Sequence, residues 1–347
     1  MGMGMDMDMG RGRGRGGRGG ARRPDVPIAV VRGRDFYDGP MDSLTVILRT
    51  VGCYRAREGR ACTMCGYIRD CATTPPTSSE LVRQMERALS KAPSGAFVLK
   101  LYTSGSFFDP TEVPEEARRT ILRMCAHERV ERLVVETRCE LATKNVLEEA
   151  ASIMPRLEIA IGLESASDAV RGECIGKGTT FSDYEAAVMR ASALGIPTKT
   201  YLLLKPPFLS EGEAMQDVLS SIEKVAPLSR RISVNLCNVQ RGTLVERLWR
   251  RGEYRPPWLA SAVEILLEAK RAHGNHVIMC DPVGAGSARG PHNCGRCDRA
   301  VANAIRSFSE TQDVSYLEEV REECECYGIW RRVLALDHRG YGTPAFL

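Results

Sequence analysis

Alternating strand and helix patterns between residues 44 and 273 most restrict the fold of this 347-residue chain. Short β-branched or aliphatic runs occur at 44–48, 97–102, 133–136, 159–163, 198–204 and 232–236. Helical patterns occur at 79–91, 114–128, 144–153, 181–194, 211–226 and 257–273. Strands that alternate with helices form parallel sheets with helical crossovers. We therefore expect an α/β fold, either a partial (β/α)6 barrel or an open wound sheet, with functional groups at the carboxyl ends of the strands.

Composition divides the chain into three parts. Residues 1–23 contain six Arg, nine Gly and two Asp and have little to bury, so we expect a disordered tail. Such a tail either holds RNA weakly or only keeps the chain in solution. It accounts for the whole formal net charge of +4, which leaves residues 24–347 neutral overall. We expect an α/β domain over 24–280 and, over 281–347, a small region that a bound metal ion holds together.

The sequence has no apolar run long enough to span a membrane and no apolar signal segment near its start. We therefore expect a protein of the reducing cytoplasm, without a membrane partner. Thirteen Cys is a high number for such a chain. Because disulfides are disfavoured in a reducing compartment, clustered Cys indicate metal binding or catalysis instead.

The first cluster consists of Cys53, Cys62 and Cys65, which follow the first predicted strand with the spacing C-x8-C-x2-C. Three thiolates on one loop can hold three irons of a 4Fe–4S cluster and leave the fourth iron open to a small molecule. Cys71 would be a fourth ligand only if the site were structural. Zinc is another alternative, but its sites usually pair C-x2-C with a second ligand pair. The position of the loop before a long α/β series favours a catalytic cluster.

The second cluster lies near the C-terminus, where Cys294 and Cys297 form a C-x2-C turn. Cys280 and one of the pair Cys324 and Cys326 would complete a tetrahedral site, and we expect Cys326 to be the fourth ligand. His292 is a competing ligand. We expect a structural zinc ion here that contributes folding energy directly. An auxiliary iron–sulfur cluster is the alternative.

Motifs at the ends of successive predicted strands resemble those of the radical S-adenosylmethionine (SAM) superfamily over roughly residues 40–280. Besides the Cys loop, they include a turn at 103–106 and the segments 136–138, 162–165 and 175–180. The resemblance implies a radical SAM barrel, a 4Fe–4S cluster and bound SAM. It places the SAM contacts at Met64, Ser104, Gly105, Ser106, Glu136, Arg138, Glu164 and Lys177. The turn departs from the family pattern, because Ser104-Gly105 replaces a Gly-Gly pair and no acid follows; the branch with the Elongator catalytic subunit shares this feature.

Three segments, 59–70, 239–264 and 290–298, resemble the radical SAM proteins of archaeosine biosynthesis. That family implies a lyase that acts on tRNA carrying a lysine-modified 7-deazaguanine in the D-loop. It also implies a separate lysine-transferase subunit as partner and an electron donor for the cluster. Two alternatives remain: another radical SAM tRNA-modifying enzyme of the Elongator type, and a non-catalytic protein that binds zinc and RNA.

Substrate-binding residues are harder to assign. Lys205 ends the fifth predicted strand and Asn235 lies in the sixth, so both could face a substrate or be satisfied core residues. The basic, aromatic stretch around Trp249 and Trp258 could stack on RNA. We favour the alternative that these two Trp pack a helix against the barrel. No catalytic side chain is predicted.

Overall fold

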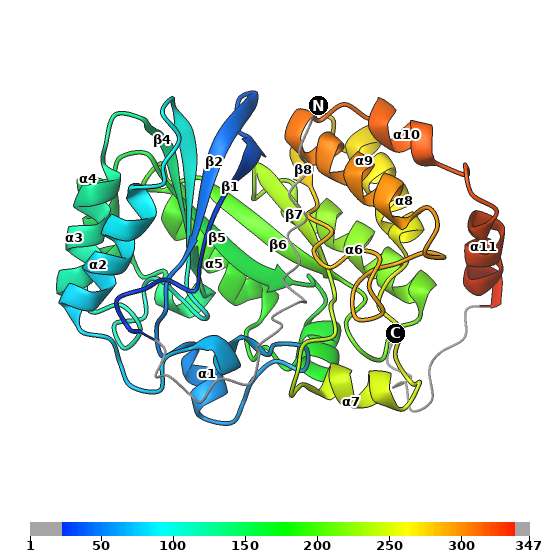
Figure 1. Cartoon of the computed structure of the whole chain (residues 1–347), viewed down its shortest axis with the longest axis horizontal. Coiled ribbons are helices and arrows are strands. Elements are labelled where there is room, and N and C mark those ends of the chain that lie inside the picture. The colour runs from blue at the N-terminus through cyan, green and yellow to red at the C-terminus, as the bar shows by residue number, and fades with distance from the viewer. Residues whose placement is uncertain (1–22, 337–347) are drawn as a thin grey trace.

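A computed structural model describes residues 23–336, which form one curled sheet with helices packed against it (Figure 1). The tail predicted over 1–23 therefore lies almost wholly outside the described residues. The sheet has the strand order β1 to β8 along the chain. Its strands are β1 (Ala29–Phe36), β2 (Pro40–Ile47), β3 (Phe97–Tyr102), β4 (Val130–Thr137), β5 (Leu157–Glu164), β6 (Thr198–Leu204), β7 (Arg231–Leu236) and β8 (Val277–Met279).

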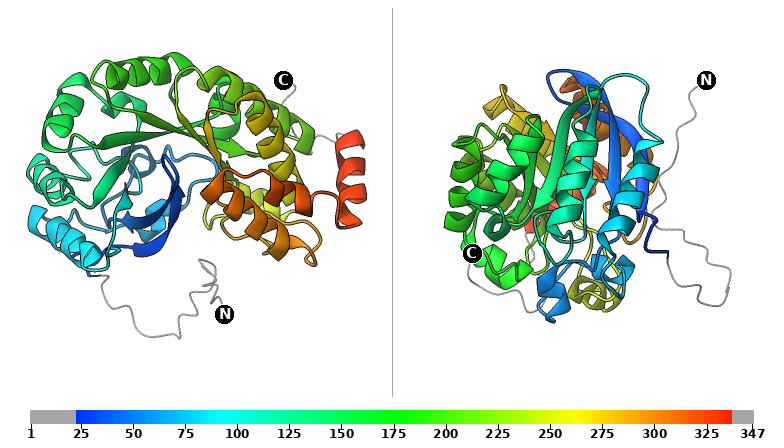
Figure 2. Two further views of the ribbon diagram at one scale, coloured as in Figure 1. Left: turned by 90° about the horizontal axis from the view of Figure 1, so that it is seen from above. Right: turned by 90° about the vertical axis from the view of Figure 1, so that its left-hand side faces the viewer.

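All six predicted strands are present, as β2 to β7, and they pair in parallel. The sheet curls into a half-barrel with helices on its convex side (Figure 2), so the predicted α/β partial barrel is confirmed. The helices are α1 (Tyr54–Arg57), η1 (Tyr67–Asp70), α2 (Ser78–Leu89), α3 (Glu115–Cys125), η2 (Cys139–Leu141), α4 (Lys144–Ile153), η3 (Val170–Ile175), α5 (Phe181–Ser192), α6 (Glu211–Val225), α7 (Leu244–Arg250), α8 (Leu259–Ala272), α9 (Asp298–Thr311), α10 (Ser315–Val320) and α11 (Cys326–Leu336).

Local sequence explains where the long helices begin. Helices α2, α5 and α6 each start with a capping box, in which the N-cap hydroxyl and an acid three residues later satisfy each other's backbone N–H groups. The N-cap residues are Thr77, Thr180 and Ser210. These helices then carry an apolar stripe that faces the sheet.

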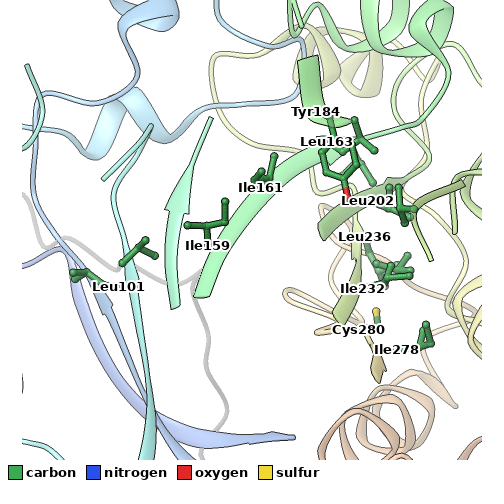
Figure 3. Close-up of a cluster of buried hydrophobic side chains, with 14 of the residues drawn as sticks. Leu101, Ile159, Ile161, Leu163, Tyr184, Leu202, Ile232, Leu236, Ile278 and Cys280 are labelled. Atoms are coloured by element: carbon green, nitrogen blue, oxygen red, sulfur yellow. The ribbon is translucent and has the colours of Figure 1, made fainter. Parts of the chain in front are cut away.

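The main core lies between the sheet and its helices. Residues two apart in a strand share one face, and Leu101, Ile159, Ile161, Leu202 and Ile232 are fully buried on the helix side (Figure 3). On the concave side a small separate cluster forms around Val98, Val134 and Ala160. Most other concave-side positions are polar, so this side is available for chemistry.

Two strands were not predicted from the sequence. β1 pairs antiparallel with β2 through a tight turn in which Tyr37 and Gly39 exchange backbone hydrogen bonds. The Gly, Arg and Asp residues of β1 interrupt the run of apolar residues by which strands are recognised in a sequence. β8 has only three residues and pairs with β7. Helix α9 contacts both β1 and β8, so the C-terminal region packs across the two ends of the sheet.

Every helix within residues 23–336 falls short of the length and hydropathy that a membrane span requires.

Candidate SAM and metal sites

The loop that carries Cys53, Cys62 and Cys65 directly follows β2, at the carboxyl edge of the parallel strands (Figure 1). Cys53 N donates to the Ser104 carbonyl at 3.3 Å, which fixes the start of the loop against the turn after β3. Near its end, Thr63 donates through its N and Oγ1 to carbonyls of Ile175 and Cys174 at 2.9 and 2.7 Å. The loop therefore lies between the ends of β3 and η3.

The three thiols are half-buried and close enough to affect one another's ionisation. The pKa of Cys65 is raised to about 12: burial is the largest cause, the backbone N–H of Tyr67 lowers the pKa, and the neighbouring Cys62 and Cys53 raise it. Because a 4Fe–4S cluster takes one thiolate at each of several separate irons, a loop with three neighbouring thiols is suited to hold such a cluster.

The turn after β3 approaches the Cys loop so closely that only glycine fits. A Cβ on Gly105 would lie 2.6 Å from Cys53 Cα and 2.0 Å from Glu112 Oε1. Glu112 accepts hydrogen bonds from Ser106 N at 2.8 Å and Thr50 Oγ1 at 2.6 Å, and burial raises its pKa to about 7. Sequence reasoning missed Glu112, which comes six residues after the turn and supplies a carboxylate beside it.

Glu136 near the end of β4 is a half-buried carboxylate on the concave side. It has no hydrogen-bond partner among the described residues. Burial raises its pKa to about 8; the Lys177 ammonium lowers the pKa, and Glu164 and Glu112 raise it. A buried carboxyl group without a partner is available to hydrogen-bond with a bound ligand.

Glu164 at the end of β5 forms an ion pair with Lys177, with 2.7 Å between Oε1 and Nζ. Burial lowers the pKa of Lys177 but the Glu164 carboxylate raises it above its usual value. A Cβ on Gly162 would lie 2.7 Å from the Lys177 Nζ and 2.8 Å from Glu164 Oε1, so the pair occupies space left by the glycine. Arg138 donates to the Lys177 carbonyl at 3.1 Å and pairs with Glu140.

Cys62 links the thiol loop to these strand ends. Burial raises its pKa, the ammonium of Lys177 and the guanidinium of Arg138 lower it, and Glu164 and Cys53 raise it. The structure therefore brings the three thiols, Glu164, Lys177 and Arg138 into one site. Met64 is half-buried there and packs against the core.

The two predicted substrate residues differ in their surroundings. Lys205 is buried and donates to Glu211 Oε2 at 2.6 Å, while Glu211 Oε1 accepts from Trp258 N and Ser261 Oγ. This network satisfies Lys205 as a core residue. Asn235 is half-buried on β7, and its side chain has no hydrogen-bond partner among the described residues, so it remains a candidate.

A layer of charged residues underlies the site and was not predicted. Arg231 on β7 pairs with Asp35 on β1 at 2.6 Å and with Glu158 on β5 at 2.8 Å. Lys199 on β6 lies among them, and burial together with the Arg231 guanidinium lowers its pKa to about 7. Tyr201 lies on the same face of β6 as Lys199, and its hydroxyl is 2.7 Å from that of Tyr102. We call Asp35, Glu158, Lys199 and Arg231 the barrel floor.

In the second Cys site, the structure corrects one predicted ligand. Cys294, Cys297, Cys324 and Cys326 have all their sulfurs within 4.8 Å of one another. Cys280, at the end of β8, is not in this group: it is buried, and its backbone exchanges hydrogen bonds with Ser309. Both members of the late Cys pair are in the group: Cys324 lies just before α11 and Cys326 is the first residue of that helix.

The sulfur spacing of this group suits one metal ion. Cys294 Sγ lies 3.7 Å from the sulfurs of both Cys297 and Cys324, and Cys297 Sγ lies 3.6 Å from that of Cys326. A tetrahedral zinc site with bonds of about 2.3 Å places its sulfurs about 3.8 Å apart. His292 instead faces the Gly290 carbonyl at 2.8 Å.

The two tryptophans of the basic stretch pack against other side chains. Trp258 is 7% exposed and joins Cys326, Tyr327 and Trp330 in a small apolar cluster. Trp249 lies under the guanidinium of Arg289, 4.9 Å from the ring centroid. Trp249 also packs against the main core, as expected, whereas Trp258 packs against α11 instead.

No protein-family model matches the chain. It is 46% identical over 323 residues to the archaeosine synthase subunit beta of Methanosarcina acetivorans, covering 92% of each chain. It is also 46% identical over 291 residues to the protein of the same name from Thermococcus kodakarensis, covering 82% of this chain and 90% of that one.

Solved structures with a similar arrangement include radical SAM enzymes. A radical SAM methyltransferase from Sphaerobacter thermophilus has 15% identity and a TM-score of 0.46, covering 76% of this chain and 81% of its own. The archaeal Elp3 of Methanocaldococcus infernus has 15% identity and a TM-score of 0.49, covering 62% and 55%. On the 46% identity that extends over nearly its whole length, the chain belongs to the archaeosine synthase subunit beta family.

Proposed function

We propose that this protein is the radical SAM lyase that completes archaeosine in tRNA. Its substrate is a tRNA with a lysine-modified 7-deazaguanine in the D-loop. It cleaves the carbon–nitrogen bond within the lysine, which leaves the formamidine base and releases the rest of the lysine as an aldehyde. A lysine-transferase subunit supplies this substrate, and an electron donor reduces the cluster. The observation that carries the proposal is the 46% identity to two archaeosine synthase beta subunits, together with the three-thiol loop beside Glu136, Glu164 and Lys177.

The chain's own residues have separable roles in this proposal. Cys53, Cys62 and Cys65 would hold three irons of a 4Fe–4S cluster. When bound, the cluster and SAM supply one-electron cleavage of a carbon–sulfur bond and hence a hydrogen-abstracting radical. Glu136 accepts hydrogen bonds from the ribose hydroxyls, and Met64 packs on the adenine.

The turn at Ser104, Gly105 and Ser106 receives the methionine end of SAM. Glu112 stabilises this turn by accepting a hydrogen bond from Ser106 N. Lys177 and Arg138 offer positive charge for the carboxylate of SAM, and Glu164 orients Lys177 through their ion pair. The buried side chains of the barrel floor fill the concave side of the sheet at the end away from the thiols. This filling helps to exclude water from a reactive intermediate.

The direct test is conversion of lysine-bearing tRNA by the reduced enzyme under anaerobic conditions, with nucleosides identified by mass spectrometry. We expect archaeosine to form. Intact modified base, with full cluster occupancy and SAM turnover, would refute the lyase assignment and favour a different tRNA modification of the Elongator type.

We also propose that the group Cys294, Cys297, Cys324 and Cys326 binds a structural zinc ion. The sulfur spacing of 3.6–3.7 Å supports a single tetrahedral ion over an auxiliary iron–sulfur cluster. Metal analysis of the purified protein should find one zinc per chain besides iron. Zinc at both Cys sites and no iron would instead favour the non-catalytic zinc and RNA-binding alternative.

A further inference from the structure

We propose that the surface formed by residues 55–70 and 240–253, here called the arginine rim, docks the tRNA, and that the ring of Tyr67 stacks on one of its bases. The inference rests on the proposed function, because it takes tRNA as the substrate. It adds the surface and the residues that bring the RNA to the Cys loop.

The two segments of the arginine rim pack directly on each other. Gly66 N donates to Gln240 Oε1 at 2.6 Å, and Val245 N donates to the Thr63 carbonyl at 3.3 Å. A Cβ on Gly66 would lie 2.8 Å from the Arg241 carbonyl oxygen, so the backbones approach as closely as they can. Helices α1 and α7 accordingly lie along the same edge of the molecule as the Cys loop (Figures 1 and 2).

Positive charge is concentrated on this surface. The two segments contain eight Arg and four acidic residues, whereas residues 24–347 as a whole are neutral. Arg241, Arg247 and Arg251 are exposed, and their side chains have no hydrogen-bond or ion-pair partner among the described residues. Unpaired guanidinium groups are suited to phosphate, which they can bind through two donors at once. The rim therefore has three cationic groups free to contact an RNA backbone.

Tyr67 connects this charged surface to the site. Its side chain is 55% exposed, which is unusual for a large aromatic residue in this structure. Its hydroxyl nevertheless hydrogen-bonds with the Gln240 side chain and interacts electrostatically with Cys65, Glu136 and Glu164. The exposed part of Tyr67 is therefore its ring, while its hydroxyl lies beside Gln240 and within electrostatic range of the site.

An exposed ring in this position fits an RNA better than a general polyanion. Bases that leave a stack are held by aromatic side chains, while arginines follow the backbone. An enzyme that modifies a base within folded RNA must also bring that base out to its active site. Tyr67 lies two residues after Cys65, so a base on its ring would be next to the cluster loop.

The first test measures binding of an unmodified, fluorescently labelled tRNA transcript to the full-length holoprotein by anisotropy, over a range of salt concentrations. The variant Arg241→Glu/Arg247→Glu/Arg251→Glu should bind at least tenfold more weakly and with a salt slope shallower by about 2–3. The matched control is Arg83→Glu/Arg123→Glu/Arg299→Glu. It reverses the same number of exposed arginines whose side chains have no hydrogen bond or ion pair among residues 23–336, on α2, α3 and α9. The control should lose less than threefold.

The second test separates stacking from charge. Tyr67→Ala should weaken tRNA binding roughly tenfold, while Tyr67→Phe keeps the ring and stays near the wild-type affinity. Heparin offers charge without bases, so both Tyr67 variants should bind it as the wild type does. Iron content checks that the Cys loop is intact in each variant.

Specific outcomes would overturn the inference. Wild-type tRNA affinity in the rim variant, or equal losses in the rim and control variants, rules out this surface as the docking site. Equal losses of tRNA and heparin binding in Tyr67→Ala rule out stacking. These measurements need no turnover, so they are independent of the lyase assay: a wild type that binds tRNA through the rim but forms no archaeosine would refute only the proposed reaction.

Discussion

Single glycines decide how closely the strand ends can meet around the site. Gly105 lets the turn after β3 touch the backbone of Cys53, and Gly162 leaves room for the ion pair between Glu164 and Lys177. A Cβ added at either position would lie closer to neighbouring atoms than Cβ atoms do in real structures. These two residues matter through the side chain that they lack.

Replacing Gly105 with alanine should therefore displace the Cys loop. The added carbon would meet Cys53 Cα at 2.6 Å, and that atom belongs to the backbone and cannot rotate away. We expect anaerobically reconstituted Gly105→Ala to hold less than half of the wild-type iron and acid-labile sulfide. Gly172→Ala is the matched control, because its Cβ would meet nothing within 4 Å. Full iron content in Gly105→Ala would contradict this account of the turn.

The raised pKa of Glu136, about 8, predicts a pH-dependent stability in protein without SAM. A free Glu ionises near pH 4.3, so between about pH 4 and 8 the folded protein keeps a proton that the unfolded chain has released. The free energy of unfolding therefore falls as pH rises through this window. Lys177, Glu164 and Glu112 face the same carboxyl and shape its titration.

Glu136→Gln removes this ionisation. Relative to the wild type, the variant should gain stability at pH 8.5 and differ little at pH 5, by at most a few kcal/mol at about 1.4 kcal/mol per pKa unit. Urea unfolding of both proteins at the two pH values measures the difference. A difference that is the same at pH 5 and pH 8.5 would show that Glu136 is not held protonated.

At the scale of elements, the barrel floor ties together strands that are far apart in the sequence. Arg231 on β7 pairs with Asp35 on β1 and Glu158 on β5, and each of the three is at most 5% exposed. The pairs thus connect the antiparallel β1 with the middle and the far end of the parallel sheet. Breaking a buried pair is costly because it leaves an uncompensated charge in a medium of low polarity.

Arg231→Met should accordingly destabilise the protein by about 3 kcal/mol in chemical denaturation. Its neighbour Arg230 provides a control, since it pairs with Asp38 on the surface, where the two side chains are 64% and 66% exposed. Arg230→Met should cost about 0–1 kcal/mol. Similar losses in the two variants would mean that the floor is no more important than a surface ion pair.

At the scale of the whole molecule, helix α11 lies outside the main core, beside the second Cys site. Helix α11 meets the rest of the protein through Trp330, which donates to Ser261 Oγ at 2.9 Å, and through the small cluster around Trp258. Cys324 and Cys326, beside or within this helix, meet the C-x2-C turn ahead of α9. Helices α9 and α10, in contrast, contribute Val301, Ile305, Phe308 and Leu317 to the main core.

Removing the metal should therefore release the C-terminal helix while the barrel stays folded. After chelator treatment, we expect limited proteolysis to cut first between residues 321 and 336, with little change in far-ultraviolet circular dichroism. Cys324→Ser should lose the metal and show the same cleavage, whereas Cys280→Ser should keep it. Loss of metal in Cys280→Ser alone would restore the ligand set expected from the sequence.

The sequence by itself determined the α/β class, six of the eight strands that residues 23–336 contain, the three-thiol loop and the order of polar motifs at the strand ends. These features are local: strand and helix patterns repeat over a few residues, and a loop directly after a strand must lie at its carboxyl edge. Tertiary structure alone decided which residues meet across long separations. The four-Cys group contains Cys324 and not Cys280. Glu112 hydrogen-bonds to the turn after β3, and Asp35 pairs with Arg231, 196 residues away in the sequence. Such contacts depend on how the sheet curls and how its ends are covered, and no short stretch of sequence records that geometry.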